Sequence, residues 1–352
     1  MSDKLTIFIT GATGYIGGTI LQKLLEHPNK DKFDINALVR NAEKAEILSS
    51  KFGVKTVVGT LQDLDKLSSL AESAHIVIHL ADSDDVNAIN AILKGLKQRH
   101  EKTGEVPVLI HTSGAGELLD NASGEYVTET VYSDLDVAKI EALPPTALHR
   151  PVDLLVVAAD VEGYVRSHII MPGLVYGLAS GPIFDTGIAN RHTIVTPLWV
   201  RAALQRGSVG VLGQGVSRWS NVHVDDTADL FINLLDALLS SPDKVSHGRE
   251  GYFFAENDEA STAEVLQVLA KILFEMGRIK TAELVPYAED ELAKYFGFDW
   301  LARAIFSNSR CKAERARREL GWSPKYTNKE FFEGLQPEVE ILVKKEDAKK
   351  SV

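Results

Sequence analysis

The sequence predicts an α/β fold built on a doubly wound parallel sheet, followed by a smaller lobe of mixed α/β structure. Three observations lead to this prediction. Short β-rich apolar runs alternate with longer amphipathic runs in the first third of the 352 residues. A glycine-rich loop follows the first apolar run, and the pattern loosens in the second half of the chain. Strands that alternate with helices favour a parallel sheet with helices on both faces.

The expected elements follow in order along the chain. In the first third, strands are expected near residues 5–9, 33–39, 55–58, 75–81 and 106–113, with helices at 20–27, 43–52, 63–72 and 87–100. After an irregular stretch, the pattern predicts a helix at 152–163, a strand at 167–173 and helices near 197–206, 225–239 and 262–277. We therefore expect a first domain over 1–177, a second lobe over 178–342 that can interleave with the first sheet, and a charged, solvated tail over 343–352.

Composition and charge exclude several classes of function. With 38 basic against 49 acidic residues, the net charge of −11 disfavours nucleic acid and anionic membranes as partners. Cys311 is the single cysteine, and no Cys/His cluster has metal-ligand spacing, so we expect no disulfide and no metal. The run Leu5–Ile9 is too short for a signal peptide, and no apolar stretch reaches membrane-spanning length. These features predict a cytoplasmic protein.

The loop after the first strand has the pattern of a dinucleotide site. Glycines at Gly11, Gly14 and Gly17 allow a tight turn, a close approach of backbone N–H groups to a pyrophosphate, and close packing of helix on sheet. The helix that follows presents its N-terminal N–H groups and partial positive charge to the same anion. We therefore predict a Rossmann-type domain that binds NAD(P) through a loop that includes Gly11, Thr13, Gly14, Tyr15, Ile16 and Gly17.

The end of the second strand decides between the two nicotinamide cofactors. An acidic residue there would hold the adenosine ribose hydroxyls, and the sequence instead has Arg40 and Asn41, with Lys44 one turn later. A guanidinium in this place suits a 2′-phosphate. The sequence therefore favours NADP(H) and leaves NAD(H) open; in the alternative interpretation Arg40 is a solvated charge at a strand end.

Two further strand ends lie where the cofactor must pass. Thr60 and Leu61 follow the third strand, beside the expected adenine, and Ala81 and Asp82 end the fourth strand, near the expected ribose and pyrophosphate. Open α/β sheets bind ligands at the carboxyl ends of their strands. We therefore predict that these four residues contact the cofactor.

The chain resembles the extended and atypical short-chain dehydrogenases/reductases, which include epimerase/dehydratase-like enzymes, NmrA-like regulators and a fungal set of such proteins. The resemblance rests on the glycine loop and on four later stretches: HTSG at 111–114, MPGLVYG at 171–177, WSNVHVDDTA at 219–228 and SNSRCKAERARRELGWSP at 307–324. It implies that Thr112, Pro172 and Val175 lie along the cofactor and that Ser113 is the catalytic hydroxyl of the family. It also implies a Tyr with a Lys four residues later as acid–base pair.

That Tyr/Lys pair is absent at its spacing. Tyr132 and Lys139 are the nearest substitutes, but on one helix they would lie about 10 Å apart, unless an irregular segment brings them together. His149 is the other candidate proton donor, with Asp153 one helical turn beyond to orient it. Each candidate also has a purely structural interpretation. Tyr132 could be a loop tyrosine that packs locally, and His149 could be a helix cap or a surface histidine.

Two classes of function stay open. The leading hypothesis is an NADP(H)-dependent oxidoreductase that acts on a small carbonyl or hydroxyl substrate between the lobes, or a related epimerase or dehydratase. The second is a non-enzymatic NADP sensor of the NmrA-like kind. The amphipathic run 87–100 permits a homodimer, His223 is expected to support the fold, and the residues in stretches that could face a substrate are Arg191, His192, Trp199 and Arg218.

Overall fold

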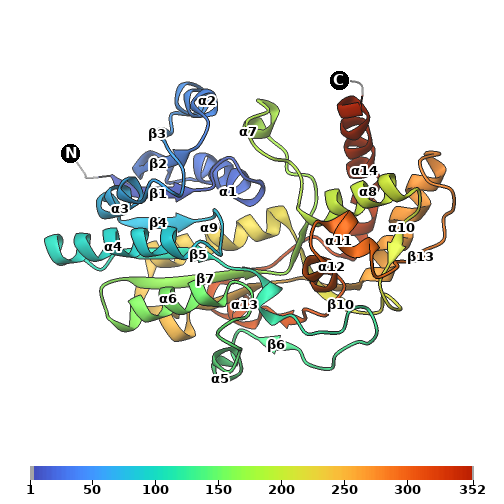
Figure 1. Ribbon diagram of the computed structural model, residues 1–352. Coiled ribbons are helices and arrows are strands. Elements are labelled where there is room, and N and C mark those ends of the chain that lie inside the picture. The colour runs from blue at the N-terminus through green and yellow to red at the C-terminus, as the bar shows by residue number, and fades with distance from the viewer. Residues whose placement is uncertain (1–3, 351–352) are drawn as a thin grey trace.

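A computed structural model describes residues 4–350 (Figure 1). Its main feature is a seven-stranded sheet with the order β11-β7-β5-β4-β1-β2-β3, in which every neighbouring pair is parallel. The α/β class with a doubly wound parallel sheet is confirmed. The strands are β1 (Leu5–Thr10), β2 (Phe33–Val39), β3 (Lys55–Val58), β4 (Ile76–His79), β5 (Val108–Thr112), β7 (Arg166–Pro172) and β11 (Tyr252–Ala255).

Helices cover both faces of this sheet. One row consists of packed neighbours α3, α4 and α6, and a second row brings α1 against α9 and α9 against α13. Because α9, α13 and β11 come from the second half of the sequence, the chain returns to complete the first lobe. These helices are α1 (Tyr15–Glu26), α2 (Ala42–Phe52), α3 (Leu64–Ser73), α4 (Val86–Thr103), α6 (Arg150–Val161), α9 (Val224–Ser240) and α13 (Glu314–Leu320).

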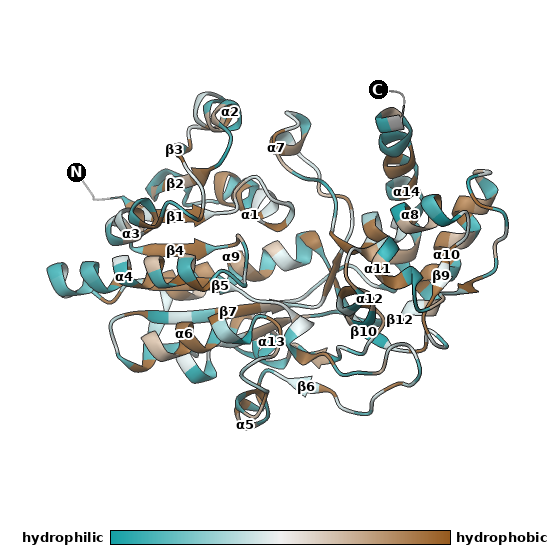
Figure 2. Ribbon diagram, viewed as in Figure 1, coloured by the Kyte–Doolittle hydropathy of each residue, from teal (hydrophilic) through white to brown (hydrophobic). Residues whose placement is uncertain are grey.

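The second lobe has its own core, beside the sheet in Figure 1. Trp199, Leu266, Phe306 and Phe331 are among its buried side chains, and Figure 2 shows apolar ribbon facing inward in both lobes. Its strands are β8 (Leu174–Tyr176), β9 (Gly210–Val211), β10 (Arg218–His223), β12 (Glu259–Ser261) and β13 (Val285–Pro286). Its helices are α8 (Val195–Arg206), α10 (Thr262–Glu275), α11 (Glu291–Phe296), α12 (Asp299–Ile305) and α14 (Asn328–Lys350), whereas the short helix α7 (Pro182–Asp185) packs on α1 and buries Ile183 and Phe184 in the core of the first lobe.

The expected tail is solvated, but it is also helical. Helix α14 continues through residue 343 to Lys350, and residues 344–349 are exposed or half-buried along it. Only the first residue of the predicted tail differs: Val343 is 3% exposed and joins Val339 and Leu342, at helical spacing, in the core of the second lobe. Residues 351–352 of the predicted tail lie outside the described part of the chain.

The irregular segment 114–151 carries little regular structure. It contains the 3₁₀ turn η2 (Ala115–Leu118), strand β6 (Tyr132–Ser133) and helix α5 (Val137–Glu141), and β6 pairs in parallel with β14 (Cys311–Lys312). Further 3₁₀ turns are η1 (Lys30–Lys32), η3 (Pro242–Lys244) and η4 (Gly248–Glu250). Within residues 4–350, no helix combines the length and the apolar character that crossing a membrane requires.

Candidate functional site

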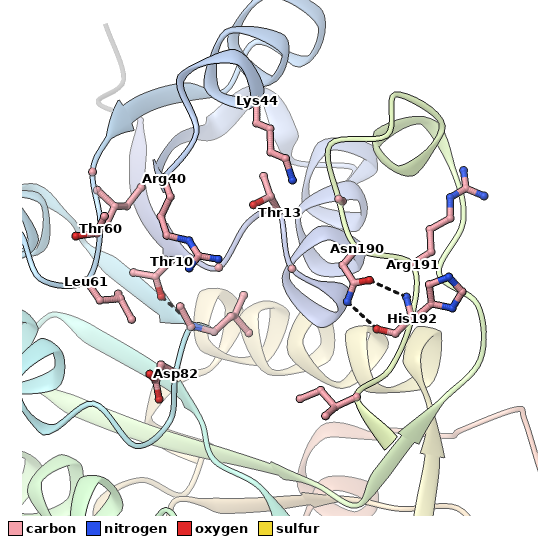
Figure 3. Close-up of a pocket in the computed structure, with 18 of the residues that line it drawn as sticks. Thr10, Thr13, Arg40, Lys44, Thr60, Leu61, Asp82, Asn190, Arg191 and His192 are labelled. Atoms are coloured by element: carbon pink, nitrogen blue, oxygen red, sulfur yellow. Dashed lines mark hydrogen bonds between the residues drawn. The ribbon is translucent and has the colours of Figure 1, made fainter. Parts of the chain in front are cut away.

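A cavity of about 1090 Å³ opens at the carboxyl ends of β1, β2, β3 and β4 (Figure 3). The strand order reverses between β1 and β4, and open α/β sheets bind ligands at such a point. Most of the predicted cofactor residues meet here: the cavity is lined by Gly11, Thr13, Gly14, Arg40, Thr60, Leu61, Ala81 and Asp82. The sheet thus brings together residues as distant in sequence as Gly11 and Asp82, and the cavity has room for a dinucleotide.

The glycine loop fits a pyrophosphate because side chains are excluded from it. Gly11 has a φ of +73°, and a Cβ on it would lie 2.8 Å from the carbonyl oxygen of Leu80. A Cβ on Gly17 would lie 2.1 Å from the carbonyl oxygen of Gly11. Gly14 caps α1 without a side-chain hydrogen bond, so the first N–H groups of the helix stay available to an anion.

Two basic side chains from the end of β2 and the start of α2 line the cavity. Neither the guanidinium of Arg40 nor the ammonium of Lys44 has a hydrogen bond or ion pair to another residue within the described chain. Asn41, predicted to contact the cofactor, instead caps α2 by accepting a 2.9 Å hydrogen bond from the backbone N–H of Lys44. The two unpaired cations suit a phosphate group, whereas the side-chain oxygen of Asn41 already accepts a hydrogen bond from the backbone.

The opposite wall of the cavity comes from the second half of the chain. Asn190 donates its backbone N–H to the carbonyl oxygen of Thr13 at 3.2 Å, so its loop lies against the glycine loop. His192 lies 3.2 Å from Glu338 of α14, and Lys345 of the same helix also lines the cavity. Sequence reasoning named Arg191 and His192 but missed Phe184, Gly187, Asn190 and Lys345. No local signal marks them, because their place depends on how the second lobe packs against the first.

Other predicted cofactor residues lie behind the cavity or beside it. Tyr15 donates its hydroxyl to the carbonyl oxygen of Gly177, and burial, the largest cause, raises its pKa well above the usual value. The residues absent from the lining of the cavity are Tyr15, Ile16, Gly17, Asn41, Thr112, Pro172 and Val175. Pro172 and Val175 are buried residues of β7 and β8 and pack inside the protein.

Tyr132 and Lys139 do come together, but away from the cavity. They do not share a helix: Tyr132 lies in β6 and Lys139 in α5, with the ammonium 4.8 Å from the ring centre. Lys139 donates to the carbonyl oxygen of Val131 at 3.0 Å, and neither residue lines the cavity. Because β6 pairs with β14 beneath the sheet in Figure 1, this pair is remote from the glycine loop. The geometry opposes their assignment as the acid–base pair.

His149 is held by a different carboxylate from the one that its sequence spacing suggested. Its Nδ1 lies 3.0 Å from Oδ1 of Asp84 and 3.1 Å from Oγ of Ser83, both in the loop after β4. The backbone N–H of His149 also donates to Oδ1 of Asp84 at 3.0 Å. The expectation that Asp153 orients this ring is therefore wrong. His149 has a φ of +69°, which turns it out of the line of α6 and toward β4.

Asp153 points instead into a buried polar cluster under Ser113. Its Oδ1 lies 3.2 Å from Nε2 of His111, and both side chains are fully buried. Burial lowers the pKa of His111 to about 3, so this ring is neutral. Burial, the largest cause, also raises the pKa of both Asp153 and its neighbour Glu117.

The cluster also holds a buried cation. Arg150 donates through Nη1 to Oε1 of Glu117 at 3.1 Å and to the hydroxyl of Tyr252 at 3.0 Å. Within the described residues, several of its polar atoms have no well-aligned hydrogen bond, among them Ser113 Oγ, Glu117 Oε2 and both carboxylate oxygens of Asp153. Two raised carboxyl pKa values beside one guanidinium are consistent with a pair that shares one proton.

The remaining candidates have structural partners. Trp199 is buried in the second lobe, Arg218 lies 3.8 Å from Glu259, and His223 accepts a hydrogen bond from the backbone N–H of Asp225 at the start of α9. His223 also stacks on Tyr326 with ring centres 3.9 Å apart. Within residues 4–350, no cluster of three or more His, Cys, Asp or Glu side chains is arranged to hold a metal ion.

Comparisons with known proteins agree with this architecture. Residues 7–246 match the model of the NAD dependent epimerase/dehydratase family. The oxidase ucsJ of Acremonium sp is 30% identical over 362 residues, which cover 97% of this chain and 98% of the relative.

Solved structures share the fold at low identity. A UDP-glucose 4-epimerase from Thermotoga maritima, solved with UDP-glucose, has a TM-score of 0.65 and 17% identity, and the match covers 97% of this chain and 99% of the other. A dTDP-glucose 4,6-dehydratase from Bacillus anthracis, solved with NAD, has a TM-score of 0.63 and 17% identity, with 97% and 98% covered. The chain therefore belongs to the NAD dependent epimerase/dehydratase family.

Proposed function

We propose that this protein is an NADP(H)-dependent oxidoreductase that acts on a small carbonyl or hydroxyl substrate between its two lobes. The observation that carries the proposal is the pair Arg40 and Lys44, two unpaired cations that line the cavity at the end of β2. In NAD-specific sites this place holds a carboxylate for the ribose hydroxyls. A 2′-phosphate would give both cations a partner, and the glycine loop and α1 would hold the pyrophosphate.

Similar proteins support oxidoreduction but not the choice of cofactor. The relative from Acremonium sp is named as an oxidase, which supports a redox reaction. The dehydratase from Bacillus anthracis was solved with NAD, and the sugar-nucleotide epimerase keeps redox-neutral chemistry as an alternative. The charges at the end of β2 are therefore the argument for NADP(H). The acidic composition and the single, buried Cys311 favour the cytoplasm as its compartment.

Calorimetric titration with NADPH, NADH and their oxidised forms tests the proposal. We expect NADPH to bind more tightly than NADH and Arg40→Ala to weaken NADPH binding at least tenfold, a loss of about 1.4 kcal/mol. Lys51→Ala is the matched control, since Lys51 is an exposed cation at the far end of α2. Equal affinity for NADH and NADPH would reject the cofactor choice, and absence of any dinucleotide binding would reject the function.

One observation favours a second candidate, an NADP sensor without catalysis. Ser113, the hydroxyl that the family uses in catalysis, is buried, and it is absent from the lining of the cavity. A sensor would bind NADPH as tightly as an enzyme but would never oxidise it. Incubation of the holoprotein with NADPH and a panel of aldehydes, ketones and quinones, followed at 340 nm, separates the two.

We further propose that two copies pair through α4 and α6. A groove of about 390 Å³ lies between these helices, lined in part by Leu93, Leu155 and Tyr164. Leu154 and Val161, seven residues apart on α6, are 39% and 68% exposed, which is unusual for apolar side chains at helical spacing. Sedimentation should show a dimer that Leu154→Glu with Val161→Glu converts to a monomer. A wild-type monomer at tens of micromolar would contradict the proposal.

A further inference from the structure

We propose that His149, oriented by Asp84, is the general acid and base of this site and replaces the family's Tyr/Lys pair. This inference rests on the proposed oxidoreductase function. His149 stands at the start of α6, between the loops that follow β4 and β5. It begins the helix that should carry the missing pair, and its ring nitrogen and backbone N–H are both held by the loop after β4.

The hydrogen bonds define the tautomer of the ring. The bond from His149 is the largest cause that lowers the pKa of Asp84, so this carboxylate is ionised and only accepts hydrogen bonds. The proton must therefore lie on Nδ1 for the 3.0 Å contact with Oδ1 of Asp84 to be a hydrogen bond. Ser83 Oγ, 3.1 Å from the same nitrogen, accepts a second branch of this bond. This assignment from the network leaves Nε2 as the basic nitrogen of the neutral ring.

Nε2 packs against two glycines, whose lack of a side chain makes room for the ring. A Cβ on Gly114 would lie 3.1 Å from Nε2, and a Cβ on Gly116 would lie 3.2 Å from it. Within the described residues, Nε2 has no hydrogen-bond partner, and the side chain is 16% exposed. The ring thus presents one free nitrogen at the point where β5 ends, directly after Ser113.

The same ring lies beside the cofactor cavity, although neither His149 nor Asp84 lines it. Asp82 and Asp85 line the cavity, and Ser83 and Asp84, which hold His149, are the two residues between them. The backbone is strained on both sides of this contact: Asp82, in the loop that carries Asp84, has a φ of +44°, and His149 has a φ of +69°. Residues other than glycine rarely adopt such a backbone unless the surrounding structure imposes it.

A capping role does not account for this geometry. The side chain of His149 makes no capping hydrogen bond to α6, although it occupies the residue before the helix. Asp, Asn, Ser or Thr would serve that position better, and none of them would need a positive φ. The backbone instead turns the ring away from the helix and onto the carboxylate of Asp84.

The chemistry follows from this arrangement. NADPH, when bound, supplies the hydride that adds to the carbonyl carbon of the substrate. Protonated His149 donates the Nε2 proton to the carbonyl oxygen, which gives the alcohol and leaves a neutral ring, and water restores the proton. Asp84 stabilises the cationic ring and fixes its orientation through Nδ1, as an orienting carboxylate does in other acid–base pairs. In the direction of alcohol oxidation, neutral Nε2 accepts the hydroxyl proton.

Histidine NMR of the full chain tests the dyad without any substrate. We expect the ring resonances that disappear in His149→Gln to show the Nδ1–H tautomer in wild type and a shift toward Nε2–H in Asp84→Asn. The Nε2–H tautomer in wild type would overturn the inference. His247 is the matched control because it pairs with Asp160 at 2.9 Å on the surface and should keep its tautomer in both variants.

Chemical modification tests whether Nε2 faces the cofactor. Diethylpyrocarbonate should label His149 and His247 in the free protein, and NADP⁺ should protect His149 at least fivefold but not His247. Protection of neither would overturn the inference even if NADP⁺ binds, and the proposed function would stand. If calorimetry shows no NADP⁺ binding, the proposed function fails, and the inference fails with it.

Reduction of 4-nitrobenzaldehyde by NADPH adds a kinetic test. With turnover in wild type, His149→Gln should lower kcat at least 100-fold and Asp84→Asn about tenfold, while the Kd of NADPH changes less than twofold. Imidazole in solution should restore part of the activity of His149→Gly. Unchanged kcat in His149→Gln would overturn the inference. If wild type does not turn over this aldehyde, the NMR tautomer and the NADP⁺ protection experiment decide whether the inference holds.

Discussion

The site has two ends, one at the carboxyl ends of β1 and β2 and the other at the carboxyl ends of β4 and β5, and the two are built in opposite ways. At β1 and β2, backbone glycines and two unpaired cations line an open cavity. At β4 and β5, polar side chains contact one another: His149 contacts the half-exposed Asp84, and the buried Arg150 contacts the buried Glu117. The first end depends on glycines that have no side chain, whereas the second depends on which side chains the fold brings into contact. The difference implies that binding and chemistry respond to different mutations.

Loss of the buried cation should have the largest effect. Arg150→Met leaves Glu117 and Tyr252 without their partner inside the protein, which typically costs about 3–5 kcal/mol of unfolding free energy. Urea denaturation measures it. The control Lys97→Met removes an exposed pair with Glu162 and should cost less than about 1 kcal/mol. Similar losses in both variants would show that the β5 end is not the rigid, paired region described above.

A methyl group in the glycine loop should affect binding most strongly. Gly17→Ala places a Cβ 2.1 Å from the carbonyl oxygen of Gly11, so the loop must move. We expect NADPH affinity to fall at least 100-fold, about 2.7 kcal/mol, by calorimetry. Gly334→Ala in α14, where a Cβ meets nothing within 4 Å, should leave the affinity unchanged. Retained binding in Gly17→Ala would mean that the loop does not hold the pyrophosphate.

The pH dependence of stability sharpens the contrast further. Glu117 and Asp153 have pKa values raised mainly by burial, so the folded state holds their protons more tightly than the unfolded state does. Their contribution to stability is therefore fullest below the unfolded pKa of about 4 and is lost as pH rises toward the folded value. Glu117→Gln removes one such carboxyl.

Relative to wild type, Glu117→Gln should gain about 1–2 kcal/mol of unfolding free energy between about pH 4 and pH 8. Urea denaturation at several pH values measures this difference, and Glu162→Gln, an exposed residue, is the control that should follow wild type. If the curves of Glu117→Gln and wild type run parallel, the two carboxyls do not share a proton in the folded protein.

Asn41 gives the smallest expected effect and separates a cap from a ligand. Its side chain accepts the backbone N–H of Lys44, so Asn41→Ala should cost about 1 kcal/mol of stability and change the Kd of NADPH less than twofold. Thermal denaturation and calorimetry measure the two quantities on one sample. A large loss of affinity with unchanged stability would restore Asn41 as a cofactor ligand.

The sequence alone determined the sheet and the cofactor end. Period-two and helical apolar patterns are local, so they placed the glycine loop between β1 and α1 and the strands and helices of the first lobe, except β11 and α13, which were not predicted. The position of Arg40 at the cofactor site could be predicted as well, because the end of the second strand has a fixed place in this fold. The same local reasoning placed the start of the solvated tail one residue too early, because Val343 is buried in the core of the second lobe.

Only the tertiary structure decided the partners of the catalytic candidates. Spacing along α6 suggested Asp153 for His149, but a positive φ turns the ring to Asp84, which is 65 residues away in sequence. Likewise, Lys345 reaches the cavity because the second lobe packs beside the first, which no local pattern encodes. Sequence periodicity reports which face of an element is buried; it carries no information on which distant side chain lies opposite, because that depends on the packing of whole elements.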